Sequence, residues 1–135
     1  MPEPELPLNR RILLSLPLTI ASALSVCATP HALATPSNAE AVSIEDLIRR
    51  VSTMSRVSFI RNGVEANAAD AAKHLRDKYD YFRRDIGSAE DFIRLCGTRS
   101  EVTHRPYMVR LADGKERTAA DFLTDELRQI QGHSR

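Results

Sequence analysis

A short pattern of residues occurs twice in the chain, and it constrains the fold more than any other feature. The segments "SIEDLIRRV", from Ser43, and "SAEDFIRLC", from Ser88, both follow the order Ser-x-Glu-Asp-apolar-Ile-Arg. In each segment the Ser hydroxyl can accept a hydrogen bond from the backbone three residues on, while the Asp side chain reaches back, as in a capping box. Each segment is therefore predicted to open a helix.

The likeness between the two segments continues along the chain. A shift of 45 residues matches positions of 43–57 with positions of 88–102, including Ile and Arg positions that capping does not require. A shift of 51 residues then matches positions of 63–70 with positions of 114–121. Self-similarity at a fixed spacing is typical of a repeated supersecondary unit, so we predict an internal duplication. The alternative is that capping boxes and turns look alike everywhere, because the same physics selects them.

Two dipeptides predict β-hairpins, and four capping residues predict helices around them. Asn62-Gly63 and Asp113-Gly114 stand between short β-favouring runs, and residues of these types tolerate the positive φ of a tight turn. Apolar residues recur at helical spacing after each expected N-cap. These N-caps are Ser43, Asn67, Ser88 and Thr118. Gly87 is expected to end the second helix.

The predicted fold class is α+β, a single small domain of four helices and two short hairpins. A length of 135 residues with 42% hydrophobic residues suits one modest core. The domain is expected to span 43–131, after a flexible lead-in at 35–42. Its halves, about 43–86 and 88–131, each have the order α-β-β-α, and a pseudo-twofold axis would relate them.

The N-terminus is expected to direct export. Arg10 and Arg11 precede an apolar run, 12–26, which is shorter than the about 20 residues that span a bilayer. Ala32-Leu33-Ala34 matches the signal peptidase rule, so residues 1–34 are predicted to be a signal peptide that is cleaved after Ala34. The mature chain is expected in the periplasm or secreted, with no transmembrane segment. A lipoprotein modified at Cys27, an uncleaved anchor and twin-arginine export are the alternatives.

Composition and motifs argue against several classes of function. A formal net charge of +1 gives no strong field, so no nucleic-acid partner is expected. No phosphate-binding loop, dinucleotide fingerprint or nucleophile elbow occurs, and no zinc-ligand spacing is present, so no cofactor or metal is expected. Cys96 falls on an apolar helix face, which favours a buried hydrophobe over a reactive thiol.

Two stretches are candidates for binding. The segment "KHLRDKYDYFRR", from Lys73, mixes cations with aromatics, and its interspersed Asp residues favour a solvated face over a site for an anionic polymer. The polar loop "GTRSEVTHRPYM", from Gly97, is the better candidate, because long loops in small domains often carry function. With the first turn and the second helix, the candidate residues are Arg61, Asn62, His74, Arg99, Ser100, His104, Arg105 and Tyr107.

Two classes of function follow from these residues. The leading prediction is a non-enzymatic binding module for a partner protein of the cell envelope or an anionic envelope polymer, with no catalytic residue. The alternative is a small hydrolase or transferase that uses His104 or His74 with nearby hydroxyls. Apart from these two, a scaffold whose role lies in its oligomer is a third option. An enzyme would bring a His, an acid and a nucleophile together in a concave site.

Five stretches of the chain resemble one bacterial family. They are "FIRNG", "AAKHLRDK", "AEDFI", "PYMVRLADG" and "FLTDEL", in that order between Phe59 and Leu127. The chain is thereby similar to the small exported proteins known as domain of unknown function 5329. The resemblance implies export and a single domain, and it implies no catalytic residue. This chain departs from the family pattern at Ala66, where an aromatic is common, and at "EVTHR" before "PY", where a Ser/Gly-rich stretch is common.

Overall fold

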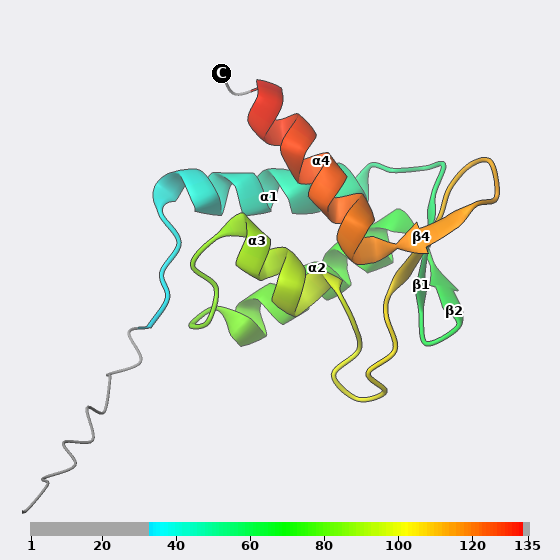
Figure 1. Cartoon of the computed structure of the whole chain (residues 1–135), viewed down its shortest axis with the longest axis horizontal. Helices are drawn as coiled ribbons and strands as arrows, with labels where there is room; N and C mark the ends of the chain where they lie inside the picture. Colours follow the sequence, from blue (N-terminus) through cyan, green and yellow to red (C-terminus); the bar gives the residue numbers. More distant parts are fainter. Residues whose placement is uncertain (1–32, 134–135) are drawn as a thin grey trace, which may run out of the picture. The chain divides into compact units, whose positions relative to one another are not determined.

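The computed structural model describes residues 33–133, in which helices pack on one face of a small antiparallel sheet (Figure 1). Four α-helices and four strands form this α+β domain in the described residues, as predicted. In chain order they are α1 (Asn38–Ser52), β1 (Ser58–Arg61), β2 (Val64–Ala66), α2 (Ala68–Phe82), α3 (Ala89–Phe92), β3 (Met108–Arg110), β4 (Glu116–Thr118) and α4 (Ala119–His133). A π-helical turn, η1 (Ile93–Gly97), continues α3.

The predicted signal peptide lies almost wholly outside the described residues, which begin at Leu33. Among residues 33–133, no helix is long and apolar enough to cross a membrane.

The first helix begins earlier than predicted. Its N-cap is Ser37, whose side chain accepts a hydrogen bond from the backbone N–H of Glu40 at 3.3 Å. Ser43 therefore lies inside the helix, and most of the expected lead-in at 35–42 is helical. Glu40 explains the extension, because its carboxylate accepts from the backbone N–H of Ala89 at 2.7 Å and so fixes this first turn to the start of α3.

The other three predicted caps are confirmed. The side chains of Asn67, Ser88 and Thr118 accept from backbone N–H groups at 2.9, 3.1 and 3.2 Å, respectively, in each case from the Asp three residues on. Each cap pairs an otherwise unpaired N–H group at a helix start.

Helix α2 ends at Phe82, four residues before the predicted end. The backbone N–H of Asp85 donates to the carbonyl of Phe82 at 2.8 Å, which turns the chain out of the helix. Ile86 is then fully buried from a non-helical position, and the carbonyl of Arg84 accepts from Ala34. The chain leaves the helix so that Ile86 can enter the core.

Both predicted hairpins form, and they join into one sheet. Asn62 and Gly63 have φ of 54° and 81°, and Gly114 has φ of 82°, as tight turns require. The strand order is β2-β1-β3-β4, so each half of the chain supplies one hairpin and the central pair joins the halves. This order suits the predicted pseudo-twofold axis, and the duplication itself stays a prediction.

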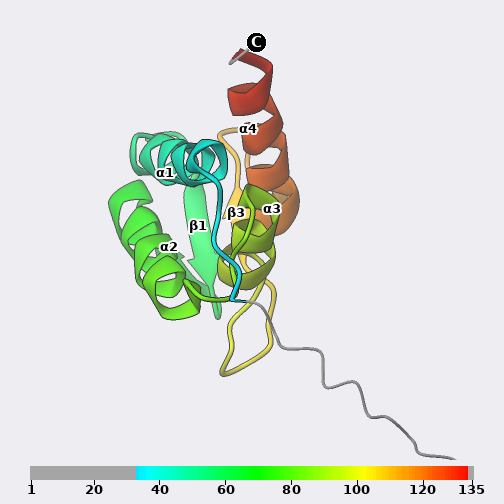
Figure 2. The same ribbon diagram turned by 90° about the vertical axis from the view of Figure 1, so that its left-hand side faces the viewer.

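One face of the sheet is buried and the other is solvated. Phe59 and Val109 are register partners at the centre, and both are buried against the helices. On the opposite face, Arg110 forms ion pairs with Glu65 of β2 and Glu116 of β4. Figure 2 shows α1 beside α2, and α3 beside α4, with β1 and β3 visible between the two pairs.

Close packing around η1 buries the cysteine and requires a glycine. Cys96 is fully buried, as predicted, and burial raises the pKa of its thiol to about 12. A thiol with this pKa stays protonated and unreactive at neutral pH. A Cβ on Gly97 would lie 2.5 Å from Cδ1 of Leu123, so η1 approaches α4 this closely because residue 97 has no side chain.

Candidate functional site

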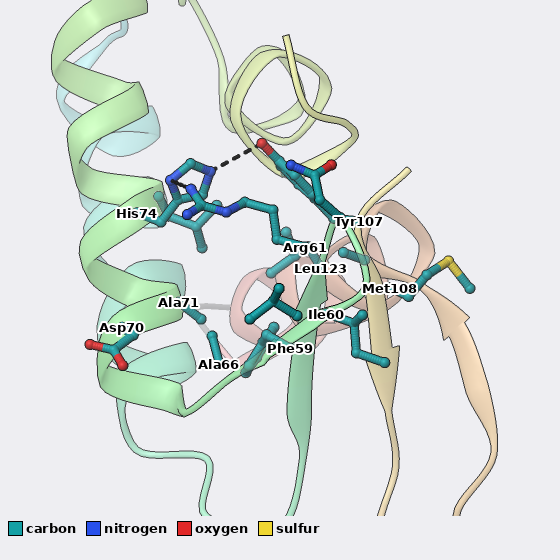
Figure 3. Close-up of a pocket in the computed structure, with 15 residues that line it drawn as sticks. Phe59, Ile60, Arg61, Ala66, Asp70, Ala71, His74, Tyr107, Met108 and Leu123 are labelled. Carbon is teal, nitrogen blue, oxygen red and sulfur yellow. Dashed lines mark hydrogen bonds between the residues drawn. The ribbon is translucent and has the colours of Figure 1, made fainter. Parts of the chain in front are cut away.

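A cavity of about 280 Å³ opens between the buried face of the sheet, helix α2 and the first turns of α4 (Figure 3). We call it the inner cavity. Its walls are mainly apolar, and most of its polar groups belong to Arg61, Asn62, Asp70, His74 and Tyr107. The apolar lining comes from Phe59, Ile60, Val64, Ala66, Ala71, Leu75, Gly97, Met108, Ala119 and Leu123.

Strand register places Arg61 and Tyr107 beside each other at this cavity. Ile60 pairs with Met108, so the next position along each strand sets Arg61 opposite Tyr107. Side chains alternate between the two faces of a strand, so Arg61 lies on the same face as Phe59, towards the helices. Arg61 there meets His74, which projects from α2.

The three side chains form a chain of hydrogen bonds. Nη1 of Arg61 lies 2.9 Å from Nδ1 of His74, and Nε2 of His74 lies 3.1 Å from the hydroxyl of Tyr107. Arginine only donates, so Nδ1 accepts, and a neutral His74 therefore carries its proton on Nε2. His74 then donates to the Tyr107 oxygen. The Tyr107 proton has no acceptor among the hydrogen bonds of the described residues.

Charge and burial keep His74 neutral. Desolvation lowers the pKa of His74 below its usual 6.5, and the nearby cations Arg61, Lys78 and Lys73 lower it further. The carboxylate of Asp77 acts in the opposite direction and raises the pKa. Desolvation also raises the pKa of the Tyr107 hydroxyl above 10.0. A neutral imidazole and a protonated phenol are therefore the forms present at neutral pH.

A second hollow, of about 420 Å³, shares four lining residues with the inner cavity. We call it the outer hollow. Arg61, Asn62, His74 and Tyr107 line both spaces and thus form a partition between them. The remaining lining of the outer hollow is Lys78, Tyr81, Phe82, Ser100, Glu101 and Val102.

Lys78 packs against the partition. It was predicted to be one of the solvated cations of the second helix, but it is 8% exposed. Its Nζ donates to the carbonyl of Arg99 at 3.1 Å and contacts Glu101 at 3.4 Å. The same Nζ lies 5.4 Å from the centre of the Tyr107 ring, within the range of a cation–π contact. Aromatic and carbonyl groups thus replace the water that Lys78 was expected to keep.

The predicted binding loop divides between structural and exposed residues. Ser100 is buried, and its hydroxyl accepts from the backbone N–H groups of Val102 and Thr103, both at 3.3 Å. The hydroxyl of Thr103 donates to Asn62 at 2.5 Å, which joins the loop to the first hairpin. These bonds hold the loop against the partition.

The other three loop candidates lie away from both hollows. Arg99, His104 and Arg105 are exposed and line neither space. His104 has a positive φ of 56°, and its backbone N–H donates to the carbonyl of Ser100 at 2.9 Å, so it forms part of a tight turn. The structure thus brings Arg61, Asn62, His74, Ser100 and Tyr107 together and leaves these three apart.

The apolar wall of the inner cavity was not predicted as a site. Phe59, Ala71 and Leu123 come from three elements far apart in the sequence, and each was expected only to face the core or stand in a strand. No local pattern signals an unfilled volume, because such a volume depends on how the elements pack. The one available signal was the run of small residues at the start of α2.

The predicted enzyme alternative, which stays a prediction, needs an acid and a nucleophile beside His74 or His104. Asp70 lines the inner cavity with His74, but its carboxylate accepts from the side chain of Asn67 at 2.9 Å. Ser100 lines only the outer hollow, and its oxygen is engaged within its own turn. Within residues 33–133, no three His, Cys, Asp or Glu residues are grouped as metal ligands.

Comparison with known proteins identifies relatives without a known activity. The model of a family of unknown function, DUF5329, matches residues 37–131. The uncharacterized protein YfeK of Salmonella typhimurium is 32% identical over 68 residues, which cover 50% of this chain and 57% of that protein. The chain thus matches little more than half the length of this relative. No solved structure matches the chain.

Replacing Lys78 by Met is expected to destabilise the domain. The apolar side chain would leave the carbonyl of Arg99 without its donor in a partly buried contact, at a cost of about 1 kcal/mol. Lys73→Met is the control on the same helix, because Lys73 is exposed and only pairs with Asp77, a contact worth about 0.5 kcal/mol or less. Urea unfolding measures both, and equal losses would contradict a supporting role for Lys78.

Acidification is expected to destabilise the domain through His74. The unfolded chain takes up a proton near the usual pKa of 6.5, whereas the folded chain resists until a lower pH. Unfolding therefore binds a proton in this window, and the free energy of unfolding falls as the pH drops. His74→Gln, which can make similar hydrogen bonds but does not titrate, should lose less stability between about pH 7.5 and 5.5. Identical pH profiles from urea unfolding would contradict the assignment.

Proposed function

The chain belongs to the DUF5329 family of unknown function, and we propose that it is an exported binding module that takes an apolar group into the inner cavity. The group belongs to an envelope component or to a partner protein. One observation carries the proposal: a mainly apolar cavity of about 280 Å³ is bordered by a few fixed polar groups. Ligand sites in proteins have this composition, with apolar walls for affinity and a few polar groups for orientation.

The setting of the cavity also supports binding. Hydrogen bonds link the side chains of the partition across β1, α2 and the loop before β3, which favours a preformed site. Preformed sites lose little conformational freedom on binding. In addition, three strongly exposed apolar residues border the two hollows: Val64 at the inner cavity, and Tyr81 and Val102 at the outer hollow. Such residues at the rim of a cavity are typical of an interaction surface.

Export is part of the same proposal, and the N-terminal sequence supports it. The apolar run 12–26 after two arginines and the Ala-x-Ala motif at Ala32 match a secretory signal. We expect the mature protein to be recovered from the periplasm or the medium with Thr35 as its first residue. N-terminal sequencing after cell fractionation checks this expectation, and an intact N-terminus on a cytoplasmic protein would overturn it.

Filling the inner cavity is expected to abolish binding of an apolar probe. Ala71→Phe would place a ring in the cavity, whereas Ala69→Phe, on the same helix but outside the cavity, would leave it open. The uncharged fluorophore N-phenyl-1-naphthylamine should bind the wild-type chain and Ala69→Phe with similar affinity. Ala71→Phe should weaken binding about tenfold or more, because about 1.4 kcal/mol is one decade in affinity.

Two results of the fluorescence titration would contradict the proposal. The first is that the wild-type chain shows no saturable binding of the fluorophore, and the second is that both variants bind it equally. Either result means that the inner cavity is not a binding site. Far-UV circular dichroism checks that each variant keeps its helices, so that a loss of binding reports on the cavity and not on unfolding.

A further inference from the structure

The hydrogen-bond donors at the edge of the inner cavity outnumber the acceptors. Arg61 uses one N–H group on His74, and within residues 33–133 its guanidinium has no other hydrogen bond. Tyr107, which is 8% exposed, accepts from His74 and keeps its own O–H proton for another partner. The guanidinium of Arg61 is exposed at the rim and the hydroxyl of Tyr107 is buried beside it, so both are available to donate to an acceptor group of a ligand.

The charges at the edge of the inner cavity limit which acceptor group the ligand can carry. Lys78 is already engaged with Arg99 and Glu101, so Arg61 is the cation without a carboxylate partner in the lining of the two hollows. A single guanidinium balances a single negative charge. A singly charged anion therefore fits this edge better than a doubly charged phosphate. The planar fork of arginine matches a carboxylate, with two parallel N–H···O bonds.

The volume of the inner cavity limits the apolar part. A cavity of about 150 Å³ lined by apolar side chains holds one benzene molecule, and the inner cavity is nearly twice as large. It therefore has room for roughly 12 carbon atoms on that scale. This is the size of a medium-length acyl chain.

We propose that the ligand is a monocarboxylate with a medium-length apolar chain, of the medium-chain fatty acid class. The chain lies in the inner cavity between the sheet, α2 and Leu123. The carboxylate lies at the partition, where the guanidinium of Arg61 and the hydroxyl of Tyr107 donate to it. His74 is a positioning residue, because it forms hydrogen bonds with both donors. Since His74 donates to the Tyr107 oxygen, the O–H proton of Tyr107 points away from His74. This inference rests on the proposed function, since it needs the inner cavity to bind apolar groups.

Three probes that share an octyl-type hydrocarbon tail and differ in their head group separate the effect of charge on binding from that of apolarity. Octanoate, 1-octanol and octyltrimethylammonium are titrated into the full-length chain by isothermal calorimetry at about pH 8, where the acid is ionised and His74 is neutral. Octanoate should bind about tenfold more tightly than 1-octanol, because a charge-assisted pair contributes more than a neutral hydrogen bond. Octyltrimethylammonium should bind most weakly, since Arg61 repels it.

Four variants assign the difference to named groups. Arg61→Met should weaken octanoate about tenfold or more and leave 1-octanol within about twofold. Arg61→Lys should fall between, because it keeps the charge and loses the fork. Tyr107→Phe should weaken octanoate severalfold with its ring still in place. Arg56→Met is the matched control, because Arg56 is exposed before β1 and lines neither hollow, and it should change nothing.

The outcomes distinguish this inference from the function on which it rests. If all three probes bind alike, or if Arg61→Met weakens octanoate and 1-octanol equally, the carboxylate proposal fails while the apolar binding module stands. If an apolar peptide binds and octanoate does not, the fatty acid class is wrong. If neither these probes nor N-phenyl-1-naphthylamine bind, the proposed function fails as well.

Discussion

The pairing of β1 with β3 is the interaction on which the rest of the structure depends. It joins the two hairpins into one sheet, and it sets Phe59 beside Val109 under the helices. The same register sets Arg61 opposite Tyr107, so the core and the polar partition have a common origin. A slip by one residue would move Arg61 and Phe59 to the solvated face together, because alternate residues of a strand face opposite sides. The fold and the candidate site are thus specified by the same few backbone hydrogen bonds.

Local features of the chain could be predicted well where one interaction dominates. Asn62-Gly63 needs positive φ at both positions, and few alternatives to a tight turn satisfy that need. The caps at Asn67, Ser88 and Thr118 follow from the same local logic. The prediction that Ser43 is an N-cap was wrong, because the same residue pattern can also occur inside a helix. Whether a helix starts earlier depends on a distant contact, here that of Glu40 with the backbone of Ala89.

The site could be predicted only in part, for a related reason. Arg61, His74 and Tyr107 were selected as polar residues near a turn, on a helix and in a loop, but nothing local indicated that they meet. Their meeting follows from the β1–β3 register and from the packing of α2 on the sheet. Lys78 shows the converse error. Its sequence neighbours Asp77 and Asp80 suggested a solvated face, whereas its position one turn after His74 brings it under the Tyr107 ring.

Two of the residues that line the inner cavity have small side chains, which leaves its volume open. Ala66 and Ala71 border the cavity with methyl groups, while fully buried residues such as Ile44 and Phe92 lie elsewhere in the core. A larger side chain at Ala66 or Ala71 would fill empty space at modest cost, since it would displace little that is already packed. If the proposed binding function holds, substitution at these two small positions will change the ligand preference without disturbing the sheet that holds Arg61 and Tyr107 in place.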